Sequence, residues 1–337
     1  MSDRSDGRDL APPHDPQSGI TARHATWFAE RHNTLLANVE RVIRGKADVL
    51  RLALACLFAE GHLLIEDVPG VGKTSIAKAL ATSIDASWHR VQFTPDLLPS
   101  DITGVSIWNQ RSQQFEFHRG AVFANLVLGD EINRASPKTQ SALLEVMEER
   151  QVTVDAVSYN VPRPFLVIAT QNPIDLDGTY RLPEAQLDRF LMRIRVGYPD
   201  ATEEASILDQ RARGGNPPTI RPVLSAAEAA EMVTVAANVH VDPAVSRYVV
   251  ALAAATRHVP EVRLGLSPRG SLALLRAAQS RAVADGRPYV VPQDVKAMAP
   301  AVIGHRLILT AEAEVEGRRV DDLVDGVVGS VGVPAGT

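Results

Sequence analysis

The sequence of 337 residues has little cysteine and no long apolar run. Its single cysteine, Cys56, rules out a disulfide framework, and the apolar run 52–58 around it predicts a small buried side chain. No window approaches about 18 uninterrupted apolar residues, so no membrane-spanning helix is expected. The first residues contain Pro, Gly and Asp where a signal peptide needs an apolar centre. We therefore expect a cytoplasmic protein, in a reducing compartment, with residues 1–25 as a disordered leader.

Long blocks of like charge are also missing. The 35 basic and 40 acidic residues give a formal net charge of −5 and are spread along the chain, which argues against a protein that coats nucleic acid. The nine histidines are scattered and show no zinc-ligand spacing. What remains is an average globular composition, with a length sufficient for two domains.

Strand and helix patterns alternate in the first part of the chain. Short strands are expected at 62–66, 87–93, 124–128, 165–170 and 194–196. Helices are expected at 27–42, 47–59, 73–83 and 137–149, and polar turns indicate hairpins at about 105–118 and 151–161. From about residue 199 the strand patterns disappear and Ala-rich helical segments follow.

This change of pattern marks a domain boundary near residue 198. The alternating elements predict an α/β protein whose core, over 26–198, is an αβα sandwich with a parallel sheet and a hairpin insert at about 101–119. A smaller all-α lid domain with a C-terminal helix is expected over 199–337.

Residues 69–74 form a glycine-rich turn between an expected strand and an expected helix. Such a turn lets backbone N–H groups surround phosphate oxygens, and the helix N-terminus adds partial positive charge. Lys73 would reach the β- and γ-phosphates, and the Thr74 hydroxyl would ligate Mg²⁺. The pattern predicts a P-loop ATPase with ATP and Mg²⁺ as cofactors, although the full motif has glycine where this chain has Asp67. The expected ATP-binding residues are Pro69, Gly70, Val71, Gly72, Lys73, Thr74 and Ser75.

Polar side chains follow two further expected strands. Asp130 and Glu131 end the run LVLGDE, where Asp130 would hold the Mg²⁺ shell and Glu131 would polarise the attacking water. A solvated pair of loop acids is the ordinary alternative. Asn172 follows the run FLVIAT, where it could position water or sense the γ-phosphate, although an Asn after a strand is usually a turn residue.

The order of these motifs resembles that of the MoxR-type AAA+ ATPases, in the clade with an insert at helix 2. The motifs that carry the resemblance are GVGKT (70–74), DEINRA (130–135), ATQNP (169–173), LPEAQLDRF (182–190), LSPRG (266–270) and HRLIL (305–309). The match covers roughly residues 27–334. In this family the residues before GVGKT often read Glu-Asp-Val-Pro, so Asp67 fits the resemblance.

The resemblance implies roles for individual residues. Walker A, Walker B and sensor 1 fall, in that order, on Lys73 and Thr74, on Asp130 and Glu131, and on Asn172. Arg189 matches the arginine finger that reaches the ATP of a neighbouring subunit, and Arg269 matches sensor 2 on the first turn of a lid helix. Without the resemblance, Asp188-Arg189 is an ordinary surface pair and Arg269 an exposed residue after a helix cap. Whether Arg269 serves its own site or a neighbour's stays open.

The resemblance also implies a function. It points to ATP hydrolysis by a homo-oligomer, a hexameric ring, that drives chaperone-like remodelling or maturation of a protein partner, often one with a von Willebrand A domain. A slow nucleotide-dependent binding switch is the main alternative. A nucleic-acid translocase is a third, which the acidic charge balance makes less favourable.

Overall fold

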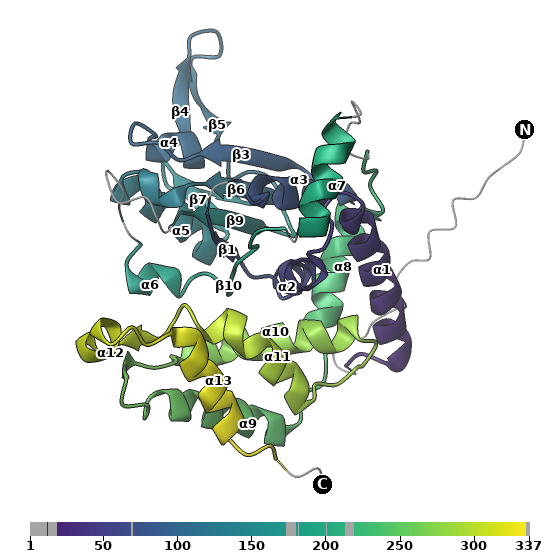
Figure 1. Cartoon of the computed structure of the whole chain (residues 1–337). Coiled ribbons are helices and arrows are strands. Elements are labelled where there is room, and N and C mark those ends of the chain that lie inside the picture. Colours follow the sequence, from purple (N-terminus) through teal and green to yellow (C-terminus); the bar gives the residue numbers. More distant parts are fainter. Residues whose placement is uncertain are drawn as a thin grey trace, which may run out of the picture.

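The computed structural model describes residues 12, 19–68, 70–172, 180, 182–199, 201–212 and 219–334 (Figure 1). Most of the expected leader and Pro69 lie outside these residues. Within them, no helix has both the length and the hydropathy that crossing a bilayer requires. The domain boundary near residue 198 stays a prediction.

The centre of the molecule is a five-stranded sheet in which all paired strands are parallel. Its order is β10 (Met192–Ile194), β1 (Leu63–Glu66), β9 (Leu166–Gln171), β6 (Leu126–Asp130) and β3 (Trp88–Gln92). The three inner strands, β1, β9 and β6, read as mostly apolar runs because both of their faces are covered. Parallel pairing brings the carboxyl ends of β1, β9, β6 and β3 to one edge of the sheet, where the polar motifs lie.

Side chains of successive strand residues point to opposite faces, and two separate cores result. Leu63, Leu128 and Ile168 belong to the core on one face, which includes residues of α1 (Ala22–Glu40), α2 (Ala47–Phe58) and α3 (Lys73–Ser83). Leu64 and Val127 belong to the core on the other face, which includes residues of α5 (Pro137–Glu149). The αβα arrangement predicted from the sequence is therefore confirmed.

Two antiparallel hairpins extend this core. The first pairs β4 (Gly104–Asn109) with β5 (Gln114–Arg119) after the short helix α4 (Pro99–Thr103), and it projects at the top of Figure 1. The second pairs β7 (Gln151–Val154) with β8 (Val157–Asn160). Both lie where polar turn residues interrupt β-rich runs.

The region after residue 199 is mainly helical, as predicted. Its helices are α7 (Ala201–Ala212), α8 (Ala226–Ala237), α9 (Pro243–Thr256), α10 (Pro268–Ala284), α11 (Pro292–Ile303), α12 (Ala311–Val315) and α13 (Val320–Ser330). Two short strand pairs were not predicted there. They are β12 (Val262–Leu264) with β13 (Ile308–Leu309), and β11 (Leu224–Ser225) with β2 (Ile84–Asp85) of the core. Pairs this short leave no alternating pattern in the sequence.

The N-terminal helix α1 connects the two parts of the molecule. It packs against α3 of the core and against α8 and α10 of the later helical region (Figure 1). It begins at Ala22, earlier than predicted, because Thr21 and His24 form a capping box that apolar spacing does not show.

Candidate active site

The glycine-rich loop forms an open concave surface between β1 and α3. Gly70 has a φ of 87° and Gly72 a φ of 92°, a backbone region that L side chains rarely adopt. No atom lies within 4 Å of the place where a Cβ would stand at either glycine. The loop therefore has room for a ligand beside its backbone, at the N-terminus of an 11-residue helix. This cradle is suited to an anion such as a polyphosphate.

Asp67, where the full motif has glycine, has a structural task. Its Oδ2 accepts hydrogen bonds from the backbone N–H groups of Val196 at 2.7 Å and Gly197 at 2.6 Å. Its Oδ1 accepts one from the N–H of Val68 at 2.8 Å. The side chain thus fixes the start of the loop to the segment that follows β10, which a glycine could not do.

Lys73 is buried at the start of α3. Its Nζ donates to the carbonyl oxygen of Asp67 at 2.6 Å and to that of Gln171 at 3.4 Å. The ammonium group therefore lies between the beginning of the loop and the end of β9, at the carboxyl edge of the sheet.

Asp130 is the most connected acid of the site. It accepts hydrogen bonds from Oγ1 of Thr170 at 2.5 Å, Nη2 of Arg90 at 2.7 Å and Oγ1 of Thr74 at 3.2 Å. Partial burial acts to raise the pKa of this carboxyl, but these hydrogen bonds and the charge of Arg90 outweigh it and hold the pKa below its ordinary value. Asp130 is therefore ionised at neutral pH.

The donors at this point fit a magnesium ion. A hydroxyl and a carboxylate are the oxygen ligands that Mg²⁺ takes, and Mg²⁺ usually binds through one or two carboxylates together with substrate phosphates. Within the described ranges, no group of three His, Cys, Asp or Glu side chains is placed to hold a metal on its own, which fits an ion shared with substrate phosphates. Thr74 and Asp130 would hold the ion beside the phosphate loop.

Glu131 follows directly and has a left-handed backbone, with a φ of 57°. Non-glycine residues in this region are uncommon and concentrate at functional sites. Its N–H donates to Oγ1 of Thr170 at 2.9 Å, and its Oε2 accepts from Nε2 of Gln92 at 2.9 Å and from Nη1 of Arg134 at 3.0 Å. The strained backbone and these partners fix the direction of the carboxylate.

One cavity of about 300 Å³ collects most of the residues expected from the sequence. It is lined by Gly70, Gly72, Lys73, Thr74, Ser75, Asp130, Glu131 and Asn172. Val71 instead packs against the main apolar core, and Pro69 lies outside the described residues. Arg90 and Gln92, which contact the two acids, were missed by the sequence analysis. They lie on β3, and only the sheet order reveals that β3 is the neighbour of β6.

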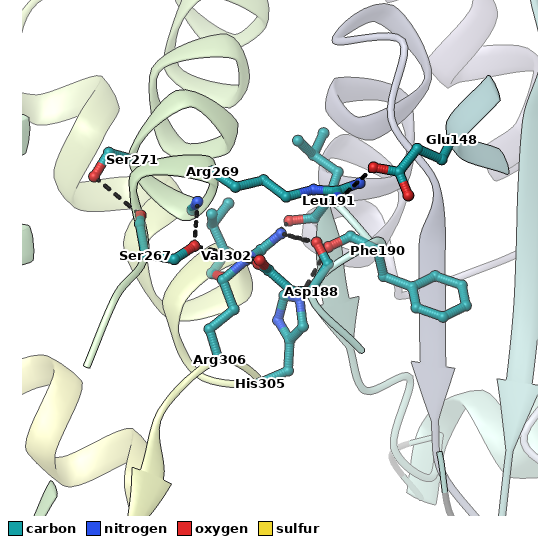
Figure 2. Close-up of polar contacts among 11 residues, drawn as sticks. Glu148, Asp188, Phe190, Leu191, Ser267, Arg269, Ser271, Val302, His305 and Arg306 are labelled. Atoms are coloured by element: carbon teal, nitrogen blue, oxygen red, sulfur yellow. Dashed lines mark hydrogen bonds and ion pairs between the residues drawn. The ribbon is translucent and has the colours of Figure 1, made fainter. Parts of the chain in front are cut away.

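Arg189 and Arg269 lie elsewhere. Both line a second cavity of about 750 Å³ on the side of the molecule formed by the end of α5, the segment after α6 (Glu184–Leu187) and the start of α10. Each forms an ion pair with Glu148, from Nε of Arg189 at 3.0 Å and from Nη1 of Arg269 at 2.9 Å (Figure 2 shows the second). Neither arginine lines the phosphate cavity of its own chain.

Arg306 joins this side of the core to the lid helices (Figure 2). It is only 8% exposed, and burial lowers its pKa although Asp188 counteracts this effect. Its Nε donates to Oδ1 of Asp188 at 2.6 Å, and its Nη groups donate to the carbonyl oxygens of Phe190 at 2.6 Å and Leu191 at 3.1 Å. Nε2 of His305 also lies 3.0 Å from the Phe190 carbonyl oxygen. The segment that carries Arg189 is therefore held by the turn after α11.

Both the sheet-containing part and the helical part of this chain match known protein families. The model of the ATPase family associated with various cellular activities (AAA) matches residues 62–192, and that of the AAA lid domain matches residues 254–327. YeaC of Bacillus subtilis (strain 168) is 48% identical over 297 residues, which are 88% of this chain and 93% of YeaC. The chaperone MoxR1 of Mycobacterium tuberculosis is 41% identical over 340 residues, covering 97% of this chain and 89% of MoxR1. A crystal structure from Cytophaga hutchinsonii aligns with a TM-score of 0.85 at 36% identity, covering 92% and 97% of the two chains.

A phosphate loop after β1 that faces acids at the end of β6, two strands away in the same parallel sheet, followed by a helical lid, defines a nucleotide-binding ATPase of the AAA+ class. Within that class, the chain belongs to the MoxR-type AAA+ ATPases. The resemblance stated from the motifs is thereby confirmed.

Proposed function

We propose that the protein hydrolyses ATP with Mg²⁺ at the carboxyl edge of its sheet, as a ring-forming, chaperone-like machine that remodels a protein partner. The observation that carries the catalytic part is the meeting of Thr74 and Asp130, 3.2 Å apart, beside the open glycine cradle. A metal-binding pair next to a phosphate site is what phosphoryl transfer needs.

Each residue of the cavity has a role in this proposal. The backbone N–H groups from Gly70 to Thr74 bind the phosphates, and Lys73 leaves its carbonyl partners to pair with the terminal phosphates. Thr74 and Asp130 hold Mg²⁺, which supplies positive charge to the phosphate oxygens. Glu131 orients the attacking water and accepts its proton, and Asn172 positions the water from the end of β9.

The two arginines act on a different nucleotide. Arg189 and Arg269 line a cavity apart from the phosphate loop of their own chain, which favours a role for both at the ATP of a neighbouring subunit. Positive charge brought to the γ-phosphate from outside stabilises the transition state, by about 10³–10⁵ in rate for an arginine finger. Hydrolysis would then depend on ring assembly.

Two observations support a protein partner. MoxR1, at 41% identity, is named a chaperone. The β4–β5 hairpin exposes Ile107, Trp108 and Phe115, the last by 69%, and exposed apolar side chains gathered on one element favour contact with another protein. The family resemblance suggests a partner with a von Willebrand A domain.

The test is Glu131→Gln, measured by phosphate release and by ATP binding. We expect nucleotide affinity and assembly to persist while turnover falls by about 10²–10⁴, the usual contribution of a general base. Glu312→Gln, an exposed acid on α12, is the matched control and should keep full turnover. Unchanged turnover in Glu131→Gln would remove Glu131 from this role. ATP binding by the wild type without repeated turnover would identify a nucleotide-dependent switch instead.

A further inference from the structure

Glu148 connects two arginines that come from distant parts of the chain. Arg189 follows α6 in the core, and Arg269 lies in the first turn of the lid helix α10. One oxygen of the Glu148 carboxylate pairs with each of them, Oε2 with Arg189 at 3.0 Å and Oε1 with Arg269 at 2.9 Å. The two guanidinium groups are therefore held by the two oxygens of one carboxylate.

Two other acids that line this cavity, Asp188 and Glu60, pair with other arginines. Asp188 pairs with Arg306 at 2.6 Å, and Glu60 pairs with Arg150 and with Arg163. Two cations brought close together repel each other, and a carboxylate that contacts both offsets this repulsion. Glu148 supplies that carboxylate.

The contacts leave both arginines able to bind phosphate. A guanidinium has five N–H donors, and the carboxylate engages Nε of Arg189 and Nη1 of Arg269. This pairing does not use the Nη groups of Arg189 or Nη2 of Arg269. A phosphate group can therefore bind these donors while Glu148 stays in place.

We propose that Glu148 is a positioning residue, which sets the spacing of Arg189 and Arg269 so that both reach the γ-phosphate of the neighbouring subunit together. This inference rests on the proposed function. The geometry also links two sites, because α5 begins at Pro137, a few residues after Glu131, and has Glu148 in its last turn. Arg189 and Arg269, which act on the ATP of the neighbouring subunit, are thus attached to the helix that starts beside the acids of their own chain's site.

The test is Glu148→Gln in the full chain. A glutamine has one acceptor oxygen in place of two, so it cannot accept from both arginines in the same way. We expect kcat in the assembled protein to fall at least about tenfold, because small displacements of catalytic groups cost one to two orders of magnitude. KM for ATP and the Kd of ATP should stay within about twofold, since the cavity that binds ATP in the same chain is intact.

The matched control is Glu149→Gln, which removes the same charge one residue further along without either arginine contact, and it should keep wild-type kcat. Mixed assemblies give a further readout, turnover on mixing, that would not change if Glu148 only stabilised the fold. Lys73→Ala subunits keep Glu148 and both arginines, so mixing them with Glu148→Gln subunits should restore turnover above that of either variant alone.

Three results would overturn the inference. They are a kcat of Glu148→Gln equal to or above the wild-type value, an equal loss in Glu149→Gln, and a loss of kcat that accompanies a lower melting temperature and is not restored in mixed assemblies. Failure of the proposed function is distinguishable from these, because it would appear as absent turnover in the wild-type protein measured in parallel.

Discussion

Nε of Arg306 lies 2.6 Å from Oδ1 of Asp188, and this contact ties the turn after α11 to the segment that carries Arg189. Arg306 also donates to the carbonyl oxygens of Phe190 and Leu191, which its removal would leave without this partner. We expect Arg306→Met to lower the free energy of unfolding by about 3 kcal/mol, as for other broken buried pairs. Urea denaturation followed by circular dichroism measures this.

The control for this prediction is Arg263→Ala. Arg263 and Glu184 form a pair at 4.0 Å in which both side chains are more than half exposed. Exposed pairs contribute less than about 1 kcal/mol, so this variant should resemble the wild type. Equal stability of Arg306→Met and Arg263→Ala would show that the Asp188 contact does not stabilise the fold.

Gly72→Ala tests the phosphate cradle. The φ of 92° at Gly72 strains any residue with a Cβ, at a cost of about 1–2 kcal/mol, and the added methyl group would occupy the space left for phosphate. We expect ATP affinity to fall at least about tenfold, measured by titration with a fluorescent nucleotide. Gly326→Ala in the middle of α13 has open space and should instead stabilise the protein by about 0.5–1 kcal/mol. Retained ATP affinity in Gly72→Ala would contradict the cradle.

Mixing experiments test whether Arg189 acts between subunits. Arg189→Ala protein keeps its own phosphate cavity, and Lys73→Ala protein keeps its Arg189. At sites where an intact cavity meets an intact arginine, we expect turnover to reappear, up to about a quarter of the wild-type rate for random equal mixing. Mixed assemblies should be verified by tagged co-purification. If they form and stay inactive at every ratio, Arg189 acts within its own chain.

His62 makes stability depend on pH. Burial lowers its pKa from the ordinary 6.5 to about 4, although the hydrogen bond with the Met147 carbonyl acts in the opposite direction. Below pH 6.5 the unfolded chain binds a proton at His62 that the folded chain binds only near pH 4. The contribution of His62 to the free energy of unfolding is therefore fully present above pH 6.5 and falls by about 3 kcal/mol as the pH decreases to 4.

Denaturation at pH 7.5, 6, 5 and 4 measures this slope. His62→Gln removes the titrating group, so it should lose stability at neutral pH and show a shallower decrease toward acid. His118→Gln, at an exposed position on β5, should keep the wild-type slope. Identical slopes for His62→Gln and the wild type would assign the acid sensitivity to other groups.

The sequence predicts the phosphate cavity well because its parts are local motifs at strand ends. Gly72, Asp130 and Asn172 each follow an apolar strand, and parallel strands end at one edge of a sheet. Gln92 and Glu148 could not be found in this way. Their importance comes from which strand lies beside β6 and from where α5 ends relative to the lid, and both are properties of the assembled fold.

The helical region shows the same division. The helix cap expected just before Arg269 is Ser267, whose Oγ accepts from the N–H of Gly270 at 3.1 Å. The pairing of β12 with β13 was not predicted, because it joins residues about 45 positions apart through a few hydrogen bonds. Arg306, within HRLIL, was part of a recognised motif, but its contact with Asp188 required coordinates.

Asp67 connects the phosphate loop to the helical region by a route that involves neither the two acids nor the arginines. Its carboxylate accepts hydrogen bonds from the N–H of Val68, at the start of the loop, and from those of Val196 and Gly197, where the chain leaves the sheet for α7. Any displacement of the loop on binding a triphosphate would therefore be passed directly to the segment that leads to the helical region. An aspartate at this position therefore joins the phosphate loop to the lid connection, a contact that a glycine has no side chain to make.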